Sequence, residues 1–342
     1  MAHEYLAQEA AKILLLSFVT FCIAMALTPI YTLFAYRYKW WKQKRTTTTT
    51  GEALAVISRL STRKRNIPTM AGLIIIIAVI VVTLIFNLDR QQTWLPLVTL
   101  IGGGLVGLID DIINVRGKGQ GVAGIRAPIK FAMITLVAAI VAWFFYYKLG
   151  YSAIHVPFVG DLTLDWWLIP LFVLVVVSTG NAVNISDGLD GLAGGLLMSA
   201  FGAFGIIASL QGNFGIAAFC MTIVGALLSY LWFNIAPARF FMGDVGSFAL
   251  GTSLGVIAML TNTLFLLPVI GLVFVAEAGS SLIQIASKKL FGRKVFVAAP
   301  IHHHLEARDW PKTKVTMRFW VIGQVAAAVG VILALVGGHI YS

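Results

Sequence analysis

The chain has 342 residues, is unusually apolar, and yet carries a formal net charge of +11. Hydrophobic residues make up 59% of it and charged residues only 11%, whereas soluble globular proteins carry about 25% charged residues. This composition excludes a soluble domain, a disordered chain and a small disulfide-stapled domain. It predicts an all-α integral membrane protein that forms a single domain over residues 1–342.

Apolar stretches long enough to cross a membrane recur along the chain, and we count about ten of them. They fall at residues 10–36, 67–87, 93–109, 128–147, 164–182, 192–210, 214–236, 243–261, 263–287 and 316–338. Between the fourth and fifth stretches, residues 155–164 alternate apolar and polar side chains around Gly160. That alternation is typical of a small hairpin.

The basic residues indicate how these helices are oriented. Of the 25 Lys and Arg, 22 lie on alternate connections, and only Lys12, Arg90 and Lys148 lie on the others. Cytoplasmic loops carry an excess of Lys and Arg, so the basic face is predicted to be cytoplasmic and both termini external, on the periplasmic side. The predicted cytoplasmic loops are residues 37–66, 110–127, 183–191, 237–242 and 288–315.

Five aspartates gather at the cytoplasmic ends of these apolar stretches. Asp110 and Asp111 end the third, Asp187 and Asp190 lie between the fifth and sixth, and Asp244 begins the eighth. Siting near helix ends is expected, because an aspartate at a helix centre costs about 2.5–3.5 kcal/mol on insertion scales. That cost does not explain why all five aspartates lie on the same side of the membrane. Their shared side favours a common site.

A structural explanation stays open for each aspartate. Asp187 and Asp190 can be turn residues that cap the next helix, and Asp244 can cap its own helix. If their segment is helical, Asn184, Asp187 and Asp190 share one face because they are three residues apart. Carboxylates without sulfur ligands suit a hard cation such as Mg²⁺, and nearby basic residues suit a polyanion. Together they predict a Mg²⁺-assisted site that handles phosphate groups.

Two further polar features interrupt the apolar pattern. His302, His303 and His304 follow Pro300, but adjacent helical residues point about 100° apart, so they cannot all ligate one ion from a regular helix. Contact with a phosphate or leaving group is favoured over a polar loop without a role. Glu277 is an intramembrane acid, which marks function or a structural feature. We favour the structural reading, a kink or a bond to a neighbouring helix.

Several motifs together resemble a known family. The main strings are NAVNISDGLDGLAGG (181–195), FMGDVGSFALG (241–251) and APIHHHLEARDWPKTKVTMRFW (299–320), joined by PTMAG (68–72), GLIDD (107–111) and VAEAGSSLIQ (275–284). In this order they resemble the bacterial phospho-N-acetylmuramoyl-pentapeptide transferases. The aspartate motifs are shared by the wider polyprenyl-phosphate N-acetylhexosamine-1-phosphate transferase superfamily, and the stretch 299–320 is the more specific signal.

The resemblance implies an activity and a location. It implies Mg²⁺-dependent transfer of phospho-N-acetylmuramoyl-pentapeptide from UDP-N-acetylmuramoyl-pentapeptide to undecaprenyl phosphate, giving lipid I and UMP in peptidoglycan synthesis. It also implies a multi-pass homodimer among the lipids of the bacterial cytoplasmic (inner) membrane, with its active site on the cytoplasmic face and no nucleic-acid partner. A broken ninth helix that opens a lipid groove is implied as well.

Site residues carry over only where this sequence matches the family's motifs. Asp110, Asp111 and Asp244 match the essential catalytic acids, and Asp244 matches the metal ligand. Residues that match the uridine site are Gly188, Leu189, Asp190, Asn234 and Phe241, with Asn184 and Asp187 in the same pocket. Residues that match positions around the phosphates and the lipid are Lys64, Thr69 and Lys130. The catalytic signature loop over the cleft is matched by His302, His303 and His304.

The sequence departs from the family pattern and leaves alternatives open. NIPTMAG stands where GTPTMGG is usual, Ser186 replaces a Thr, and Asn114 replaces a Lys whose phosphate contact Arg116 or Lys118 can supply. Both direct attack by the lipid phosphate, with Asp110 or Asp111 orienting it, and an aspartyl-phosphate intermediate fit the residues. Alternative functions are a sibling N-acetylglucosamine-1-phosphate transferase and, remotely, a cation-coupled transporter.

Overall fold

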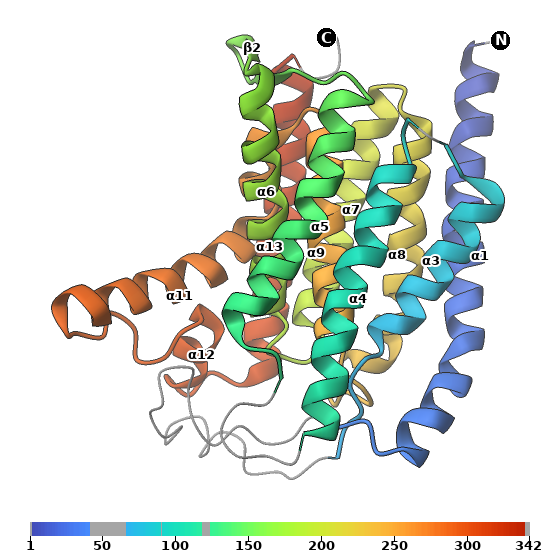
Figure 1. Ribbon diagram of the computed structural model, residues 1–342. Helices are drawn as coiled ribbons and strands as arrows, with labels where there is room; N and C mark the ends of the chain where they lie inside the picture. The colour runs from blue at the N-terminus through green and yellow to red at the C-terminus, as the bar shows by residue number, and fades with distance from the viewer. Residues whose placement is uncertain (1, 42–65, 90, 118–123, 339–342) are drawn as a thin grey trace.

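In this computed structural model, apolar helices form a bundle whose long axes run between two ends of the molecule (Figure 1). The structure describes residues 2–41, 66–89, 91–117 and 124–338. Within them, eight helices are long and apolar enough to cross a membrane, and a bent pair makes a ninth if it counts as one span. The expected helical membrane protein is confirmed.

The helices follow the predicted stretches closely. The long ones are α1 (Ala2–Arg37), α4 (Trp94–Arg116), α5 (Ala127–Tyr147), α6 (Leu168–Ser186), α7 (Leu192–Leu210), α8 (Phe214–Asn234), α9 (Gly243–Leu260), α11 (Leu272–Phe291) and α13 (Lys312–Val336). The shorter ones are α3 (Gly72–Phe86), α10 (Leu267–Ile270), α12 (Ile301–Glu306) and two 3₁₀ turns, Asp165–Trp167 and Leu264–Leu266. Because α3 is only 15 residues long, the count of ten spans stays a prediction.

Helix α9 forms the centre of the bundle, and all 18 of its residues are buried. It packs mainly against α4 and α6, with α3 and α7 beside it. Small residues allow this close packing, as they do between membrane helices in general. A Cβ added at Gly107 of α4 would overlap the backbone of Asp244, and one at Gly251 of α9 would lie 2.8 Å from Gly180 Cα of α6. Backbone contact at these glycines therefore fixes the position of the first turn of α9.

The outer helices present large apolar side chains to their surroundings. Leu14 and Phe18 of α1, Leu136 of α5 and Val325 of α13 are each at least 60% exposed. Side chains of this kind on the outside of a helical bundle are suited to contact with lipid. The pattern agrees with a multi-pass membrane protein.

The predicted hairpin is confirmed and lies at the same end as the start of α1 and the end of α13 (Figure 1). Strand β1 (Ala153–Val156) pairs antiparallel with β2 (Gly160–Thr163). His155 anchors it: one ring nitrogen lies 2.7 Å from the Asp161 carboxylate and the other 2.9 Å from the Gly337 carbonyl oxygen. The hairpin is thereby tied to the end of α13.

The implied break in the ninth helix is present at Gly271, where α10 and α11 meet at 84°. Helix α11 therefore projects away from the bundle, with α12 lying beside it (Figure 1). Glu277 lies within α11 beyond the break. Reading Glu277 as the cause of a kink is therefore wrong, whereas a bond to a neighbouring helix is correct, as described below.

Replacing Gly107 by Ala tests the close approach of α4 and α9. The added methyl group would overlap the Asp244 backbone, and overpacking of this kind costs about 1–3 kcal/mol. We expect G107A to lower the apparent melting temperature of the detergent-solubilised protein by several degrees. The matched control is G202A in α7, where nothing lies within 4 Å of an added Cβ. Equal melting temperatures for the two variants would contradict this packing.

Candidate active site

Three buried aspartates lie close together where α4, α5 and α9 meet. Asp110 and Asp111 are 0% exposed and Asp244 is 8% exposed. Asp244 lies in the first turn of α9, as expected. Helix α4 continues to Arg116, so the expectation that Asp110 and Asp111 end the helix is wrong. They lie inside the helix because neighbouring groups compensate their burial.

Lys130 of α5 bridges two of these aspartates. Its ammonium nitrogen lies 2.7 Å from Asp110 Oδ2 and 2.7 Å from Asp244 Oδ2. The other Asp110 oxygen accepts a hydrogen bond of 2.6 Å from the Ile125 N–H. The ammonium group also lies 5.4 Å from the centre of the Phe248 ring. Two carboxylates buried this close to each other need a cation between them, and Lys130 supplies it.

Asp111 and Thr69 lie on the other side of the first turn of α9. Asp111 Oδ2 accepts a 3.0 Å hydrogen bond from the Val245 N–H, so α4 holds the start of α9 directly. Gly243 adopts a φ of +78°, and a side chain there would crowd Asp111 and Thr69. The Thr69 carbonyl accepts a 2.6 Å hydrogen bond from the Tyr31 hydroxyl, while its own Oγ1 is buried with no hydrogen-bond partner in the described residues.

The turn between α6 and α7 lies next to the start of α9. Asn184 of α6 donates a 2.9 Å hydrogen bond to Ser247 Oγ of α9. Helix α6 ends at Ser186, so the segment of Asp187 and Asp190 is not helical and the condition for a shared helical face with Asn184 is not met. In the turn itself, Asp187 is half-buried, Gly188 is exposed and Leu189 is buried.

Asn234 and Asp190 hold the loop between α8 and α9 against this turn. Asn234 Oδ1 accepts a 2.9 Å hydrogen bond from the Gly191 N–H, and its amide group donates one of 2.8 Å to the Phe240 carbonyl. Asp190 Oδ2 accepts a 3.1 Å hydrogen bond from the Ala238 N–H. Phe241 at the end of the loop is 37% exposed, and its backbone hydrogen-bonds to Pro68 and Ala71.

The consecutive histidines of α12 face different partners. His302 Nδ1 lies 2.8 Å from Glu277 Oε2, and both residues are completely buried. His304 Nδ1 accepts a 3.2 Å hydrogen bond from the Val297 N–H. The separate partners agree with the expectation that the three imidazoles do not share one ion.

His303 pairs with Glu306 within α12. The His303 Nδ1 to Glu306 Oε2 distance is 2.6 Å, and Lys312 Nζ lies 3.6 Å from the other oxygen. Burial of the Glu306 carboxyl raises its pKa, but the hydrogen bond and positive charge from His303 and the charge of Lys312 outweigh burial, so the pKa lies below its usual value. This pair therefore stabilises α12 above the ordinary glutamate range, and the contribution is lost as the pH falls through the lowered pKa.

The role of Gln284 was missed at the level of sequence, and Asn114 was noted only as a departure from the family pattern. Gln284 accepts hydrogen bonds of 3.0 Å from the Val295 and Phe296 N–H groups and so holds the segment that leads to α12. The Asn114 amide oxygen, one turn beyond Asp110, is buried without a hydrogen-bond partner in the described residues. The available signal was the same in both cases, namely a polar residue in an apolar helix.

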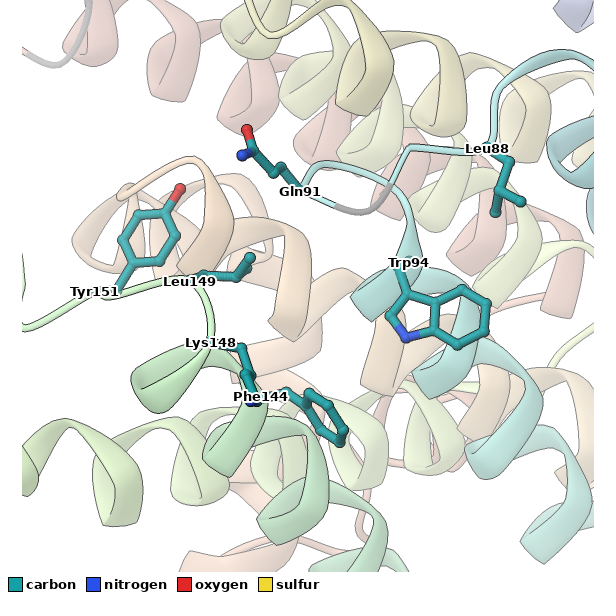
Figure 2. A pocket seen from close by; sticks show the side chains of 7 residues that line it. All are labelled: Leu88, Gln91, Trp94, Phe144, Lys148, Leu149 and Tyr151. Atoms are coloured by element: carbon teal, nitrogen blue, oxygen red, sulfur yellow. The ribbon is translucent and has the colours of Figure 1, made fainter.

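Two cavities differ in their suitability for a reaction centre. An apolar groove of about 350 Å³ lies between α6, α9, α10 and α11, lined by residues such as Val175, Leu254 and Phe274. A second cavity of about 800 Å³ lies near the start of α4 and the end of α5 (Figure 2). Its described lining includes Lys148 but no carboxylate, so it lacks the acidic groups of the α4–α9 site.

Lys64, which was expected near the phosphates, and Lys118 lie outside the described residues. The other predicted site residues form two groups. Around the start of α9 lie Asp110, Asp111, Asp244, Lys130 and Thr69. Around the α6–α7 turn lie Asn184, Asp187, Gly188, Leu189, Asp190 and Asn234. The backbone of Phe241 hydrogen-bonds to Pro68 and Ala71, which places it beside Thr69. A Cβ at Gly188 would collide with His302 Nε2, so α12 borders the second group.

The residues present fit a hard divalent cation. Asp110, Asp111 and Asp244 provide only oxygen ligands, as Mg²⁺ prefers. No group of three or more His, Cys, Asp or Glu side chains within the described ranges is arranged to hold an ion by itself. Mg²⁺ usually binds through one or two carboxylates together with water and substrate phosphates, so the absence of an all-protein cage among these residues is compatible with it.

Comparison with known proteins identifies the family. Residues 93–262 match the model of Glycosyl transferase family 4. The chain is 39% identical over 347 residues to the phospho-N-acetylmuramoyl-pentapeptide-transferase of Chloroflexus aurantiacus, covering 97% of this chain and 92% of the relative. This chain belongs to that family. The enzymes of the same name from Geobacillus thermodenitrificans (37% identity, 92% and 95% coverage) and Levilactobacillus brevis (39%, 79% and 84%) agree. As a member of the phospho-N-acetylmuramoyl-pentapeptide transferase family, the protein is a phosphoglycosyl transferase.

Replacing Lys130 by Met tests the bridge between Asp110 and Asp244. Removing one partner of a buried ion pair leaves uncompensated charge and costs about 3–5 kcal/mol, so we expect K130M to lower the melting temperature and reduce turnover by roughly a hundredfold or more. The matched control is K148M, at the other end of α5. A K130M enzyme with wild-type turnover and stability would refute the bridge.

Proposed function

We propose that the protein transfers phospho-N-acetylmuramoyl-pentapeptide from UDP-N-acetylmuramoyl-pentapeptide to undecaprenyl phosphate, producing lipid I and UMP with the help of Mg²⁺. The observation that carries the proposal is the cluster of three buried aspartates and Lys130 near the α6–α7 turn, in a membrane protein of this family. The acids and the ammonium suit a magnesium diphosphate, and the exposed Phe241 ring suits a stacked base.

The apolar groove supports a lipid acceptor. Its described lining, between α6, α9, α10 and α11, contains no charged side chain and includes Leu267, Pro268 and Leu282. A polyprenyl chain is entirely apolar, so burial in such a groove is favourable by about 25 cal/mol per Å². Helix α9 runs from this groove to Asp244, so an acceptor lying along it would carry its phosphate towards the acids.

In the proposed reaction, an oxygen of the lipid phosphate attacks the phosphorus that carries the sugar, and the bond from that phosphorus to the bridging oxygen breaks in line to release UMP. Asp244 would hold the Mg²⁺, which neutralises charge on the diphosphate when bound. Lys130 lowers the negative potential of the acids, which lets two anionic substrates approach. Asp110 or Asp111 orients the acceptor phosphate by holding Lys130 and the start of α9 in place. That phosphate is mostly dianionic near pH 7 because its second pKa is about 6.

Burial favours direct attack over an aspartyl-phosphate intermediate. Asp110 is 0% exposed, and its two oxygens accept hydrogen bonds from Ile125 and Lys130. Asp111 is equally buried and holds the Val245 N–H. A nucleophile needs an accessible oxygen in line with the phosphorus, which these contacts oppose. Neither acid is therefore placed as the attacking group.

The topology is part of the proposal. We infer ten spans in one domain, with the site and the segments 37–66, 110–127, 183–191, 237–242 and 288–315, parts of which are helical, on the cytoplasmic face of the bacterial inner membrane. The excess of Lys and Arg on that side supports this orientation. The homodimer rests on the family resemblance. A cation-coupled transporter is disfavoured because the aspartates lie at one end of the bundle, whereas transporters bind near the midplane.

The proposal is tested by UMP release from the full-length protein in detergent with undecaprenyl phosphate. We expect turnover with UDP-N-acetylmuramoyl-pentapeptide and Mg²⁺, and loss of turnover on addition of EDTA. D244A should reduce turnover by roughly a thousandfold or more, since it removes the metal ligand. The matched control is D165N, an acid at the opposite end, which should stay within about twofold of wild type.

Two results would contradict this proposal. Preference for UDP-N-acetylglucosamine would instead assign the sibling activity. Full turnover of D244A would refute the metal assignment.

A further inference from the structure

Glu277 and His302 form a buried pair that the proposed reaction does not yet use. Glu277 lies in α11 and His302 in α12, both are 0% exposed, and 2.8 Å separates Oε2 from Nδ1. Two polar atoms of the pair, Glu277 Oε1 and His302 Nε2, have no hydrogen-bond partner in the described residues. Leaving buried polar atoms unpaired costs free energy, so a second partner supplied by a ligand would satisfy them.

The unpaired ring nitrogen packs against the α6–α7 turn at Gly188. A Cβ added at Gly188 would collide with His302 Nε2, so only the absence of a side chain lets this nitrogen approach the α6–α7 turn. Gly188 is exposed and adjoins the half-buried Asp187. His302 Nε2 therefore lies directly against the exposed Gly188 of this turn.

The need for a neutral pair determines whether His302 Nε2 carries a proton. A buried pair with net charge is strongly unfavourable, so the pair is expected to be neutral overall. A neutral pair is either a carboxylate with an imidazolium or a carboxylic acid with a neutral imidazole. In the first form both ring nitrogens carry protons. In the second, Nδ1 accepts the acid proton, so the single ring proton must be on Nε2.

We propose that Glu277 is a positioning residue that keeps His302 Nε2 a hydrogen-bond donor aimed at an oxygen of the uridine nucleotide. Both neutral forms of the pair meet this condition, so the donor does not depend on where the shared proton lies. The inference rests on the proposed function, because it supplies a contact for the nucleotide of that reaction. Glu277 itself acts only through the His302 ring.

Glutamine at position 277 removes this constraint while keeping the shape. Its amide can accept a hydrogen bond from Nδ1–H or donate one to an unprotonated Nδ1. His302 can therefore present either a lone pair or a proton at Nε2. E277Q should therefore lower the share of His302 rings that carry a proton on Nε2, whereas a loss of packing alone would leave that share unchanged.

Other titratable groups near the ring affect both enzymes in the same way. The His303 ring centre lies 4.1 Å from that of His302, and Glu306 and Lys312 lie beyond it. Asp187 adjoins Gly188 on the side of the turn. Because these groups are unchanged in E277Q, the ratio of E277Q to wild-type activity at one pH reports the Glu277 contribution.

The test uses full-length wild type, E277Q, H302Q and the double variant in detergent, with UDP-N-acetylmuramoyl-pentapeptide turnover and UMP affinity as readouts. A hydrogen bond involving a charged group justifies an expected loss for E277Q of roughly ten- to hundredfold in kcat/KM and in UMP affinity at pH 8. Glutamine at position 302 keeps a donor near the position of Nε2, so adding E277Q to H302Q should cost little further. S280A, which removes a 2.8 Å hydrogen bond to the Glu277 carbonyl, is the matched control and should stay near wild type.

A spectroscopic readout separates this inference from the proposed function. In protein labelled with ¹⁵N-histidine, the His302 signals are those absent from H302Q, and Nε2 should be protonated at pH 8 in wild type and partly unprotonated in E277Q. An unprotonated Nε2 in wild type or fully additive losses would overturn the inference. Failure of wild type to release UMP, with Nε2 protonated and UMP bound, would overturn the proposed function alone.

Discussion

The placement of one ammonium group between two buried carboxylates determines the rest of the site. Asp110, Lys130 and Asp244 come from α4, α5 and α9, and each depends on the others because a buried charge without a partner is too costly. The bridge requires α4 and α9 to approach closely, which Gly107 permits. It also requires the start of α5 to lie over the start of α9. The packing of α4, α5 and α9 and the placement of the charged groups therefore depend on each other.

A buried charged group also has a compensating partner at α11 and α12. Glu277 is buried in the helix that projects beyond the break at Gly271, and His302 is the group that makes its burial tolerable. The pair thereby fixes α12 against the α6–α7 turn at Gly188. In both places, a buried pair of polar side chains holds Lys130 or His302 in one position.

Much of the architecture could be predicted from local pattern. Apolar runs located α5, α7 and α8 to within a few residues, and alternation around Gly160 located the hairpin. The end of α4 could not be predicted, because Asp110 and Asp111 interrupt the apolar run although the helix continues to Arg116. Hydropathy records the cost of burying such acids but not the partner that compensates it.

Pairing between distant residues was likewise beyond local pattern. Lys130 was expected near the phosphates, yet nothing in its neighbourhood indicates that it bridges Asp110 and Asp244. Glu277 was recognised as unusual, but its partner lies on another helix. Because α6 ends at Ser186, the helical spacing considered for Asp187 and Asp190 does not apply to them. The acids could therefore be listed from sequence, whereas their partners had to come from the fold.

The most direct measurement of the central constraint is a double-mutant cycle on the melting temperature of the detergent-solubilised protein, using D110N, K130M and D110N/K130M. If Lys130 compensates buried carboxylates, removing the Asp110 charge should relieve part of the damage done by K130M, and the double variant should be more stable than K130M alone. Losses that simply add would contradict the account, because they would mean that the ammonium and the Asp110 carboxylate do not depend on each other.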